Sequence, residues 1–121
     1  MATFNKTTLS NSTDGRAILL TGTTTGSSVT LHTTSTNSSV IDEVWLYAQN
    51  TDSTARKLTV EWGSNSSPVD LIEITVPAEA GLVLVTPGLI LKGNATPLTV
   101  KAFAASASVV TVHGYVNRIT A

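Results

Sequence analysis

The stretch Val40–Gly63 reads VIDEVWLYAQNTDSTARKLTVEWG, and it decides the fold class of this chain. The first half holds the densest apolar cluster of the chain, and the second half alternates, with Leu58, Val60 and Trp62 as its apolar positions. A period of two residues is the pattern of a β-strand with one buried face. The polar segment NTDSTA between the halves indicates a turn. We therefore predict a β-hairpin over this stretch.

The rest of the chain consists of short apolar runs separated by polar or proline-containing segments. Pro68, Pro77, Pro87 and Pro97 follow one another at intervals of nine, ten and ten residues. Proline cannot donate to a β-ladder, so it marks strand ends, edges and bulges. No window shows an apolar period of 3.6 residues, and we expect essentially no helix. The strand-length runs lie at 17–21, 29–33, 69–76, 78–96 with a possible break at Pro87, 98–104 and 108–119. Together with the hairpin they predict an all-β sandwich or barrel of about eight strands.

The composition excludes several classes of function. A chain of 121 residues is expected to form one domain, and the absence of cysteine excludes disulfides and thiolate chemistry. The net charge is −1, and no cluster of lysine or arginine provides the footprint of a nucleic-acid-binding protein. No apolar run approaches the roughly 20 residues of a membrane helix. We expect neither nucleic acid nor membrane as a partner.

The first 16 residues differ from the rest because they are polar, with Phe4 and Leu9 as isolated apolar residues. We predict that residues 1–16 form an extended N-terminal arm and that residues 17–121 form the β-sandwich domain. The alternative is a terminus that frays.

The alternation also predicts which side chains face the core. The inward positions are Val44, Leu46, Ala48, Leu58, Val60, Trp62, Ile72, Ile74, Val76, Leu98, Val100, Ala102, Val110, Val112 and Val116. Gly114 is expected at a close backbone approach or a bulge. Four aromatic residues fall on the outward positions: Trp45, Tyr47, Phe103 and Tyr115. Because a monomer rarely exposes so many aromatic side chains together, we predict that these four residues form an oligomer interface.

Chemistry-bearing residues are few. His32 and His113 follow similar strand segments, but a metal site needs at least three ligands, and we expect both histidines to be exposed. Glu61 and Glu73 are the best candidates for an acid–base pair, yet both alternate with core residues and should face solvent. No Ser lies in a nucleophile elbow. We predict no catalytic residue, no metal and no cofactor, and hence no enzyme.

The segments AQNTD (48–52), RKLTVEWG (56–63), VPAEAGLVLVTPGLILKGN (76–94) and LTVKAFAASASVVTVHGYVNRI (98–119) form a pattern. This pattern resembles small virion structural proteins of tailed bacteriophages, the capsid decoration or cement proteins. The resemblance implies a jelly-roll-like antiparallel β-sandwich that binds the outside of an icosahedral head, often as a homotrimer, with the major capsid protein as partner. It covers about residues 40–119 and not the N-terminal segment.

Two further expectations depend on this resemblance. The arm residues Thr3, Phe4 and Leu9 are predicted to contact the capsid, because a polar arm can become ordered along a partner. The start MATFNKTTLSNSTDG lacks the apolar core of a signal peptide, which favours synthesis in a host cytoplasm and a final location on the virion exterior.

The alternative function is a tail-fibre or receptor-binding module that contacts host glycans. Trp45, Tyr47 and Gln49 lie on one face of the same predicted strand. Aromatic faces that stack on sugars next to an amide side chain would suit this function.

Overall fold

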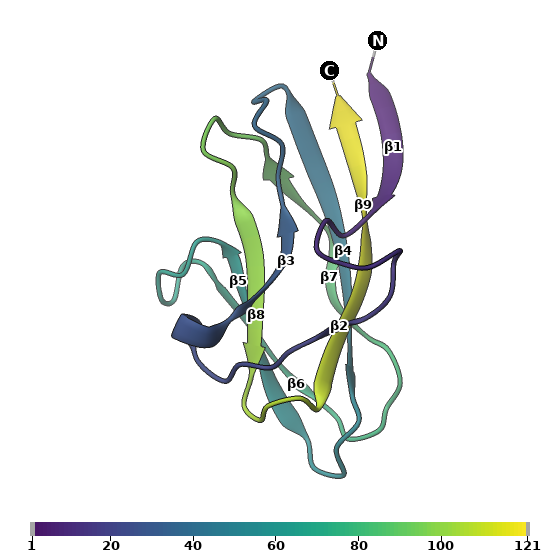
Figure 1. The fold of residues 1–121 in the computed structure, drawn as a ribbon, viewed down its shortest axis with the longest axis vertical. Coiled ribbons are helices and arrows are strands. Elements are labelled where there is room, and N and C mark those ends of the chain that lie inside the picture. The colour runs from purple at the N-terminus through teal and green to yellow at the C-terminus, as the bar shows by residue number, and fades with distance from the viewer. Residues whose placement is uncertain (1, 121) are drawn as a thin grey trace.

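The computed structural model describes residues 2–120 and is an all-β sandwich of two antiparallel sheets (Figure 1). The nine strands are β1 (Thr3–Thr8), β2 (Ile18–Leu19), β3 (Val29–Thr33), β4 (Val40–Asn50), β5 (Arg56–Gly63), β6 (Leu71–Val76), β7 (Val83–Lys92), β8 (Thr99–Ala104) and β9 (Val110–Thr120). A single 3₁₀ turn, η1 (Thr25–Ser27), is the helical element of the described residues. The predicted fold class is confirmed, and β2–β9 occupy the eight predicted strand regions.

The strands divide between a five-stranded and a four-stranded sheet. The five-stranded sheet has the order β1-β9-β4-β7, with β2 also paired to β9, and the four-stranded sheet has the order β3-β8-β5-β6. The antiparallel pairs are nested along the chain: β2 with β9, β3 with β8, β4 with β7 and β5 with β6. The long strands β4 and β9 pair from Val40–Thr120 to Asn50–Val110, and they form the centre of the five-stranded sheet.

The predicted hairpin over Val40–Gly63 is wrong, because β4 and β5 belong to different sheets. The connection is held by Asn50, whose Nδ2 donates to the carbonyl oxygens of Thr54 (2.9 Å) and Val76 (3.1 Å). Its Oδ1 accepts a hydrogen bond from the Asp52 N–H at 3.0 Å. A half-buried strand alternates in the same way whichever sheet it joins, so alternation alone did not distinguish a hairpin from a crossover.

The predicted N-terminal arm is part of the sandwich. Strand β1 pairs with β9 from Thr3–Thr120 to Thr8–Tyr115, and it extends along the edge of the five-stranded sheet (Figure 1). Leu9, which follows β1, is 1% exposed and belongs to the core. Residue 16 is therefore not a domain boundary in the packing. Backbone hydrogen bonds to β9 place this polar segment, which needs few apolar side chains of its own.

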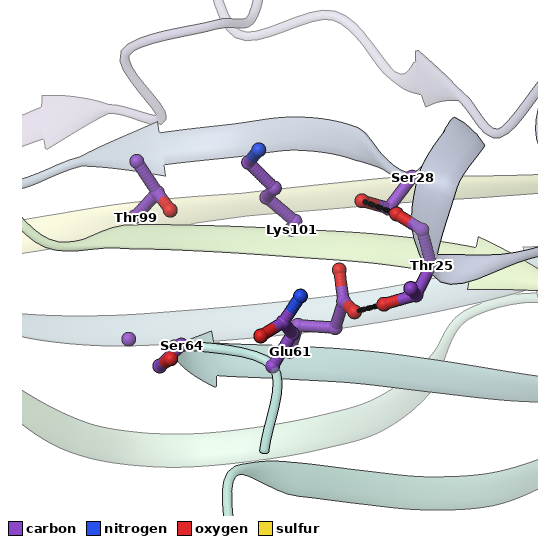
Figure 2. A pocket seen from close by; sticks show the side chains of 8 residues that line it. Thr25, Ser28, Glu61, Ser64, Thr99 and Lys101 are labelled. Atoms are coloured by element: carbon purple, nitrogen blue, oxygen red, sulfur yellow. Dashed lines mark hydrogen bonds between the residues drawn. The ribbon is translucent and has the colours of Figure 1, made fainter. Parts of the chain in front are cut away.

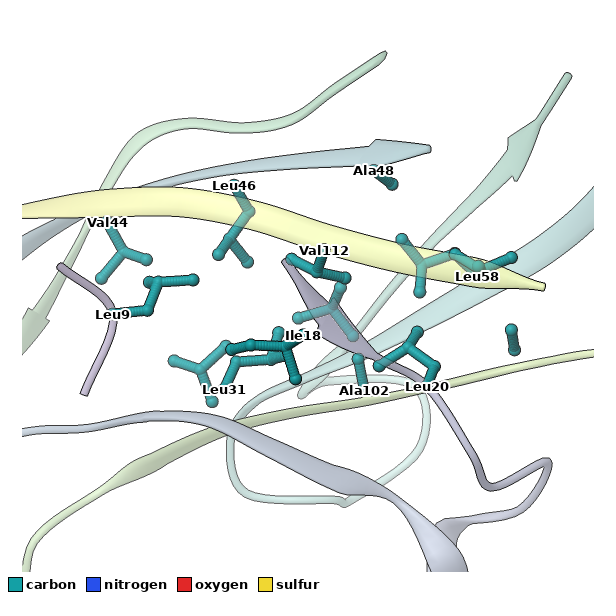
Figure 3. Packing of buried hydrophobic residues seen from close by; sticks show 14 of the residues in the cluster. Leu9, Ile18, Leu20, Leu31, Val44, Leu46, Ala48, Leu58, Ala102 and Val112 are labelled. Atoms are coloured by element: carbon teal, nitrogen blue, oxygen red, sulfur yellow. The ribbon is translucent and has the colours of Figure 1, made fainter. Parts of the chain in front are cut away.

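The core lies between the two sheets, and most predicted inward residues are buried in it (Figure 3). These are Val44, Leu46, Ala48, Leu58, Val60, Val76, Val100, Ala102, Val110, Val112 and Val116. Trp62, Ile72, Ile74 and Leu98 pack against the core but remain partly exposed. Ile72 and Ile74 lie on the edge strand β6, and Trp62 lies near the end of β5, where fewer neighbours cover a side chain.

Candidate functional site

The outer face of the five-stranded sheet carries apolar side chains on four adjacent strands. On β4 and β9, Trp45 lies opposite Tyr115 and Ile41 lies opposite Ile119, while Tyr47 lies opposite His113. The edge strands extend this face with Phe4 on β1 and with Leu84 and Ile90 on β7. We call this surface the aromatic face: Phe4, Ile41, Trp45, Tyr47, Leu84, Ile90, Tyr115 and Ile119.

The centre of the aromatic face is fixed in one arrangement. The rings of Trp45 and Tyr115 are stacked, with centroids 6.0 Å apart and planes at 9°. Lys6 Nζ lies 5.1 Å from the centroid of the Tyr115 ring, within reach of a cation–π interaction. Trp45 Nε1 donates to Glu43 Oε1 at 2.7 Å, and Asn117 Nδ2 donates to the same oxygen at 2.9 Å. These two hydrogen bonds lower the pKa of Glu43, because they stabilise the ionised carboxylate.

Two glycines leave room for Trp45. A Cβ atom on Gly114 would lie 2.1 Å from the Trp45 carbonyl oxygen, which confirms the predicted close backbone approach. Gly88 has a φ of 73°, and a Cβ atom there would lie 2.9 Å from Cζ2 of the Trp45 ring. The positive φ is a conformation that glycine adopts without strain. The backbone of Trp45 therefore depends on the small residue at Gly114, and the position of its ring depends on the small residue at Gly88.

Several members of the aromatic face are open to solvent. Phe4 is 69% exposed, Ile90 is 55% exposed and Leu84 is 45% exposed. Exposed apolar residues in a contiguous band, in contrast to scattered single ones, mark interaction surfaces. The band spans the full width of the sheet from β1 to β7.

The structure separates the predicted interface residues. Trp45, Tyr47 and Tyr115 share the aromatic face, but Phe103 is on β8 in the four-stranded sheet, opposite Thr59. The prediction of one face with four aromatics is therefore wrong for Phe103. The alternation of residues predicts which side of each strand faces outward, but it does not predict which sheet the strand joins.

The predicted capsid-contacting residues also differ from one another. Thr3 and Phe4 are exposed on β1. Leu9 is buried in the core, so the prediction that it contacts a partner is wrong.

Inside the sandwich, His32 belongs to a polar network that joins the two sheets. Its Nε2 lies 2.7 Å from Asp42 Oδ2, and its Nδ1 accepts a hydrogen bond from the Ser10 N–H at 3.1 Å. Arg118 donates to Asp42 through Nε at 2.8 Å and Nη2 at 2.9 Å. His32 is 2% exposed and Asp42 is 1% exposed. The prediction of an exposed His32 is wrong, because a register shift between Thr30 and His32 turns both Leu31 and His32 inward.

The network sets the ionisation of Asp42. Burial acts to raise the pKa of this carboxyl, but hydrogen bonds from Arg118 and His32 and the positive charge of Arg118 outweigh it and lower the pKa to about 2. Asp42 is therefore a carboxylate at neutral pH, with its charge matched by Arg118. The pairing raises the pKa of Arg118.

The two histidines do not meet. His113 is on β9 opposite Tyr47, in the other sheet from His32, and its Nδ1 is buried without a hydrogen-bond partner. Within residues 2–120 no group of three or more histidine and carboxylate side chains is placed to hold a metal ion.

The outer face of the four-stranded sheet has a polar hollow of about 260 Å³ beside η1 (Figure 2). We call it the polar hollow; its lining includes Thr25, Ser28, Glu61, Asn65, Thr99 and Lys101. The Thr25 hydroxyl donates to Glu61 Oε2, and Glu61 is only 3% exposed. The prediction that Glu61 faces solvent is therefore wrong, because η1 covers the outward side of β5. Glu73 is exposed as predicted and forms an ion pair with Lys57 at 2.6 Å.

The residues that line the polar hollow do not form a recognisable motif in the sequence. Its residues come from η1, from the end of β5 and from β8, and the segment GTTTGSS (22–28) has the composition of an ordinary loop. Only the crossing of that loop over the sheet brings Thr25 to Glu61.

No protein-family model, no curated protein and no solved structure matches this chain. Residues 2–120 contain no helix of the length and hydrophobicity that crossing a bilayer would need.

Proposed function

We propose that this protein is a structural component of a phage virion, a decoration or cement protein that binds the outside of the icosahedral head as a homotrimer. The observation that carries the proposal is the aromatic face, a preorganised apolar surface across the whole five-stranded sheet. A protein that stabilises a shell needs a broad surface for contact, and it needs neither a catalytic group nor a cofactor.

The strand order supports the proposed jelly roll. The nested pairs β2–β9, β3–β8, β4–β7 and β5–β6 are the pairs of one long hairpin, and β4–β9 and β5–β8 contacts roll that hairpin into two sheets. Two Greek keys in two sheets are the architecture of jelly rolls, which includes viral capsid domains.

The aromatic face is best suited to contacts between copies. Trp45 and Tyr115 are aromatic residues of the type enriched in the buried centre of interfaces. Their rings are already fixed by the stack, by Gly88 and by Glu43, so little side-chain entropy is lost when a partner covers them. Edge strand β1, with Phe4 exposed, then lies at the border of this interface and supplies the contact to the shell.

Glycan binding at the same face is supported less well. Trp45 Nε1 already donates a hydrogen bond to Glu43 Oε1, so the indole N–H and this oxygen are engaged before a sugar arrives. Gln49 is the remaining amide on this side of β4.

The first experiment measures the mass of the protein in solution by light scattering. We expect three times 12.6 kDa for the native chain and a folded monomer for Trp45→Asp combined with Tyr47→Ser. Phe103→Ser is the matched control, because Phe103 lies on the other sheet and its loss should leave the trimer intact. A trimer that persists in the double variant would remove the aromatic face from the interface.

The second experiment measures binding to shells of the encoding phage that have been stripped of this protein. The variant Phe4→Ser keeps the backbone of β1 and the buried Leu9, so a loss of shell binding reports the contact and not the fold. Deletion of the whole N-terminal segment is unsuitable, because it would also remove Leu9 from the core. Shell binding equal to that of the native chain would exclude Phe4 as a capsid contact.

A further inference from the structure

The Glu61 carboxylate is an unusual group for the outside of a sheet. It lies opposite Lys101 in the β5–β8 register, yet no ion pair joins the two residues in the described part of the chain. On the same face, Lys57, which is four residues before Glu61 on β5, forms an ion pair at 2.6 Å with Glu73 on the neighbouring strand β6. Glu61 is 3% exposed, and the Thr25 hydroxyl donates to one of its carboxyl oxygens. Among the described residues, His113 Nδ1 is the side-chain atom that is fully buried without a hydrogen-bond partner, so the Glu61 carboxyl is not sealed from its surroundings and can accept a further hydrogen bond.

A further hydrogen-bond donor to Glu61 would fit in the polar hollow. It lies between Glu61 and Lys101 and beside Thr25, and the figure shows the Glu61 carboxylate directed towards η1 and the hollow (Figure 2). Its volume of about 260 Å³ lies just below the range of roughly 300–1,000 Å³ that is usual for sites of drug-sized ligands. The occupant is therefore a small molecule, not a protein segment.

The lining defines the chemistry of the occupant. Glu61 accepts hydrogen bonds, Lys101 donates them, and the hydroxyls of Ser28 and Thr99 and the amide of Asn65 do both. One negative and one positive side chain give a lining with no net charge. This combination fits a neutral molecule with several hydroxyl groups, since each hydroxyl both donates and accepts.

We propose that the polar hollow binds a monosaccharide, or one sugar unit of a glycan, with a hydroxyl group donating to Glu61 and another accepting from Lys101. The inference goes beyond the proposed virion function and uses the sheet opposite to the aromatic face. Because the lining has no aromatic ring for stacking, we expect weak binding, with a dissociation constant of about 1 mM.

The experiment is a titration of the isotope-labelled protein with glucose, galactose, mannose and N-acetylglucosamine, all neutral sugars, followed by amide chemical shifts. We expect at least one sugar to shift the amides of Thr25, Glu61 and Lys101 in a saturable way. Glu61→Gln and Lys101→Met should each weaken this binding by about tenfold or more, because each loses a charged hydrogen-bond partner.

Glu73→Gln and Lys57→Met are the matched controls on the same sheet face, and they should bind the sugar like the native chain. Melting curves of all four variants separate a loss of binding from a loss of fold. Glycine serves as the zwitterionic competitor. No saturable shift with any sugar, equal binding by Glu61→Gln, shifts confined to Trp45 and Tyr115, or binding of glycine alone would each overturn the proposal.

Failure of this proposal and failure of the virion function are distinguishable. The sugar titration does not depend on the aromatic face, and Trp45→Asp with Tyr47→Ser should keep the sugar shifts. Shell binding, conversely, should survive Glu61→Gln.

Discussion

The outer face of the five-stranded sheet is largely apolar and that of the four-stranded sheet is more polar, although both arise from the same alternation of inward and outward residues. On the five-stranded sheet, the outward positions of β4 and β9 place Trp45 beside Tyr115 and Ile41 beside Ile119. On the four-stranded sheet, the corresponding positions of β5 and β8 place Glu61 beside Lys101 and Thr59 beside Phe103. The first face suits a protein partner, and the second suits water or a small polar ligand.

The two outer faces also differ in how their carboxylates are stabilised. On the five-stranded sheet, the Glu43 carboxylate accepts hydrogen bonds from two neutral donors, Trp45 and Asn117. The charge of Glu43 is therefore stabilised by short hydrogen bonds and not by an ion pair with a long, mobile side chain. On the four-stranded sheet, Lys57 and Glu73 form a solvent-exposed ion pair of the ordinary kind. The outward residues therefore distinguish the surfaces of the two sheets. The inward residues do not, because both sheets bury apolar side chains in the same core.

The two sheets are joined by the hydrogen-bond network of His32, Asp42 and Arg118, which crosses the sandwich. His32 is on β3 of the four-stranded sheet, and Asp42 and Arg118 are on β4 and β9 of the five-stranded sheet. The Ser10 N–H, after β1, joins the same network. The network thus links the N-terminal segment and both sheets.

The largest effect is expected from Asp42→Ala, which breaks this link. The change leaves His32 and Arg118 without their shared acceptor inside the sandwich, and breaking a buried ion pair typically costs about 3–5 kcal/mol. Urea denaturation at neutral pH should show a loss of this size. The control is Asp52→Ala, because the ion pair of Asp52 with Arg56 is partly exposed, so solvent screens it and its loss should destabilise the chain much less. Equal effects in the two variants would show that the network does not join the sheets energetically.

A smaller effect is expected on acidification. The pKa of Asp42 in the folded protein is about 2, below the ordinary value of 3.8, so the unfolded chain binds its proton first as the pH falls. The contribution of Asp42 is fully present above about pH 4 and is lost as the pH falls through about 2; it amounts to about 2 kcal/mol. Denaturation at several pH values measures the loss, and the carboxyl ¹³C shift of Asp42 reports its titration. A titration midpoint near 4 would contradict the assignment.

Much of the fold was predictable from the sequence, because alternation depends on local burial. Val44, Leu46 and Ala48 are fully buried, as their spacing predicts, and β2–β9 lie where the apolar runs lie. The pairing of strands was not predictable in the same way. The β4–β5 connection has the composition of a hairpin turn, yet it crosses between sheets through the hydrogen bonds of Asn50 to Thr54 and Val76.

The candidate sites were predicted only in part. Trp45, Tyr47 and Tyr115 share one face as expected, since β4 and β9 are direct neighbours. Phe103 was misplaced because its face depends on sheet membership, and Glu61 and His32 were misplaced because of irregular features. A loop crosses over Glu61, and a bulge turns His32 inward. Such features depend on single long-range contacts that leave no periodic signal.

The smallest effect is expected from Lys57→Met combined with Glu73→Gln, which removes the exposed ion pair of the four-stranded sheet. Each partner is about half exposed, 54% for Lys57 and 49% for Glu73, so solvent screens their attraction. We expect the free energy of unfolding to change by about 0.5 kcal/mol or less. We also expect the mass in solution to stay that of the native chain, because the proposed interface between copies is the aromatic face of the other sheet. This double variant is the counterpart of Trp45→Asp with Tyr47→Ser. We expect the first to change charge without changing assembly, and the second to change assembly without unfolding the chain. A monomer produced by the Lys57 and Glu73 changes would reverse the assignment, and the four-stranded sheet would then be the surface on which copies meet.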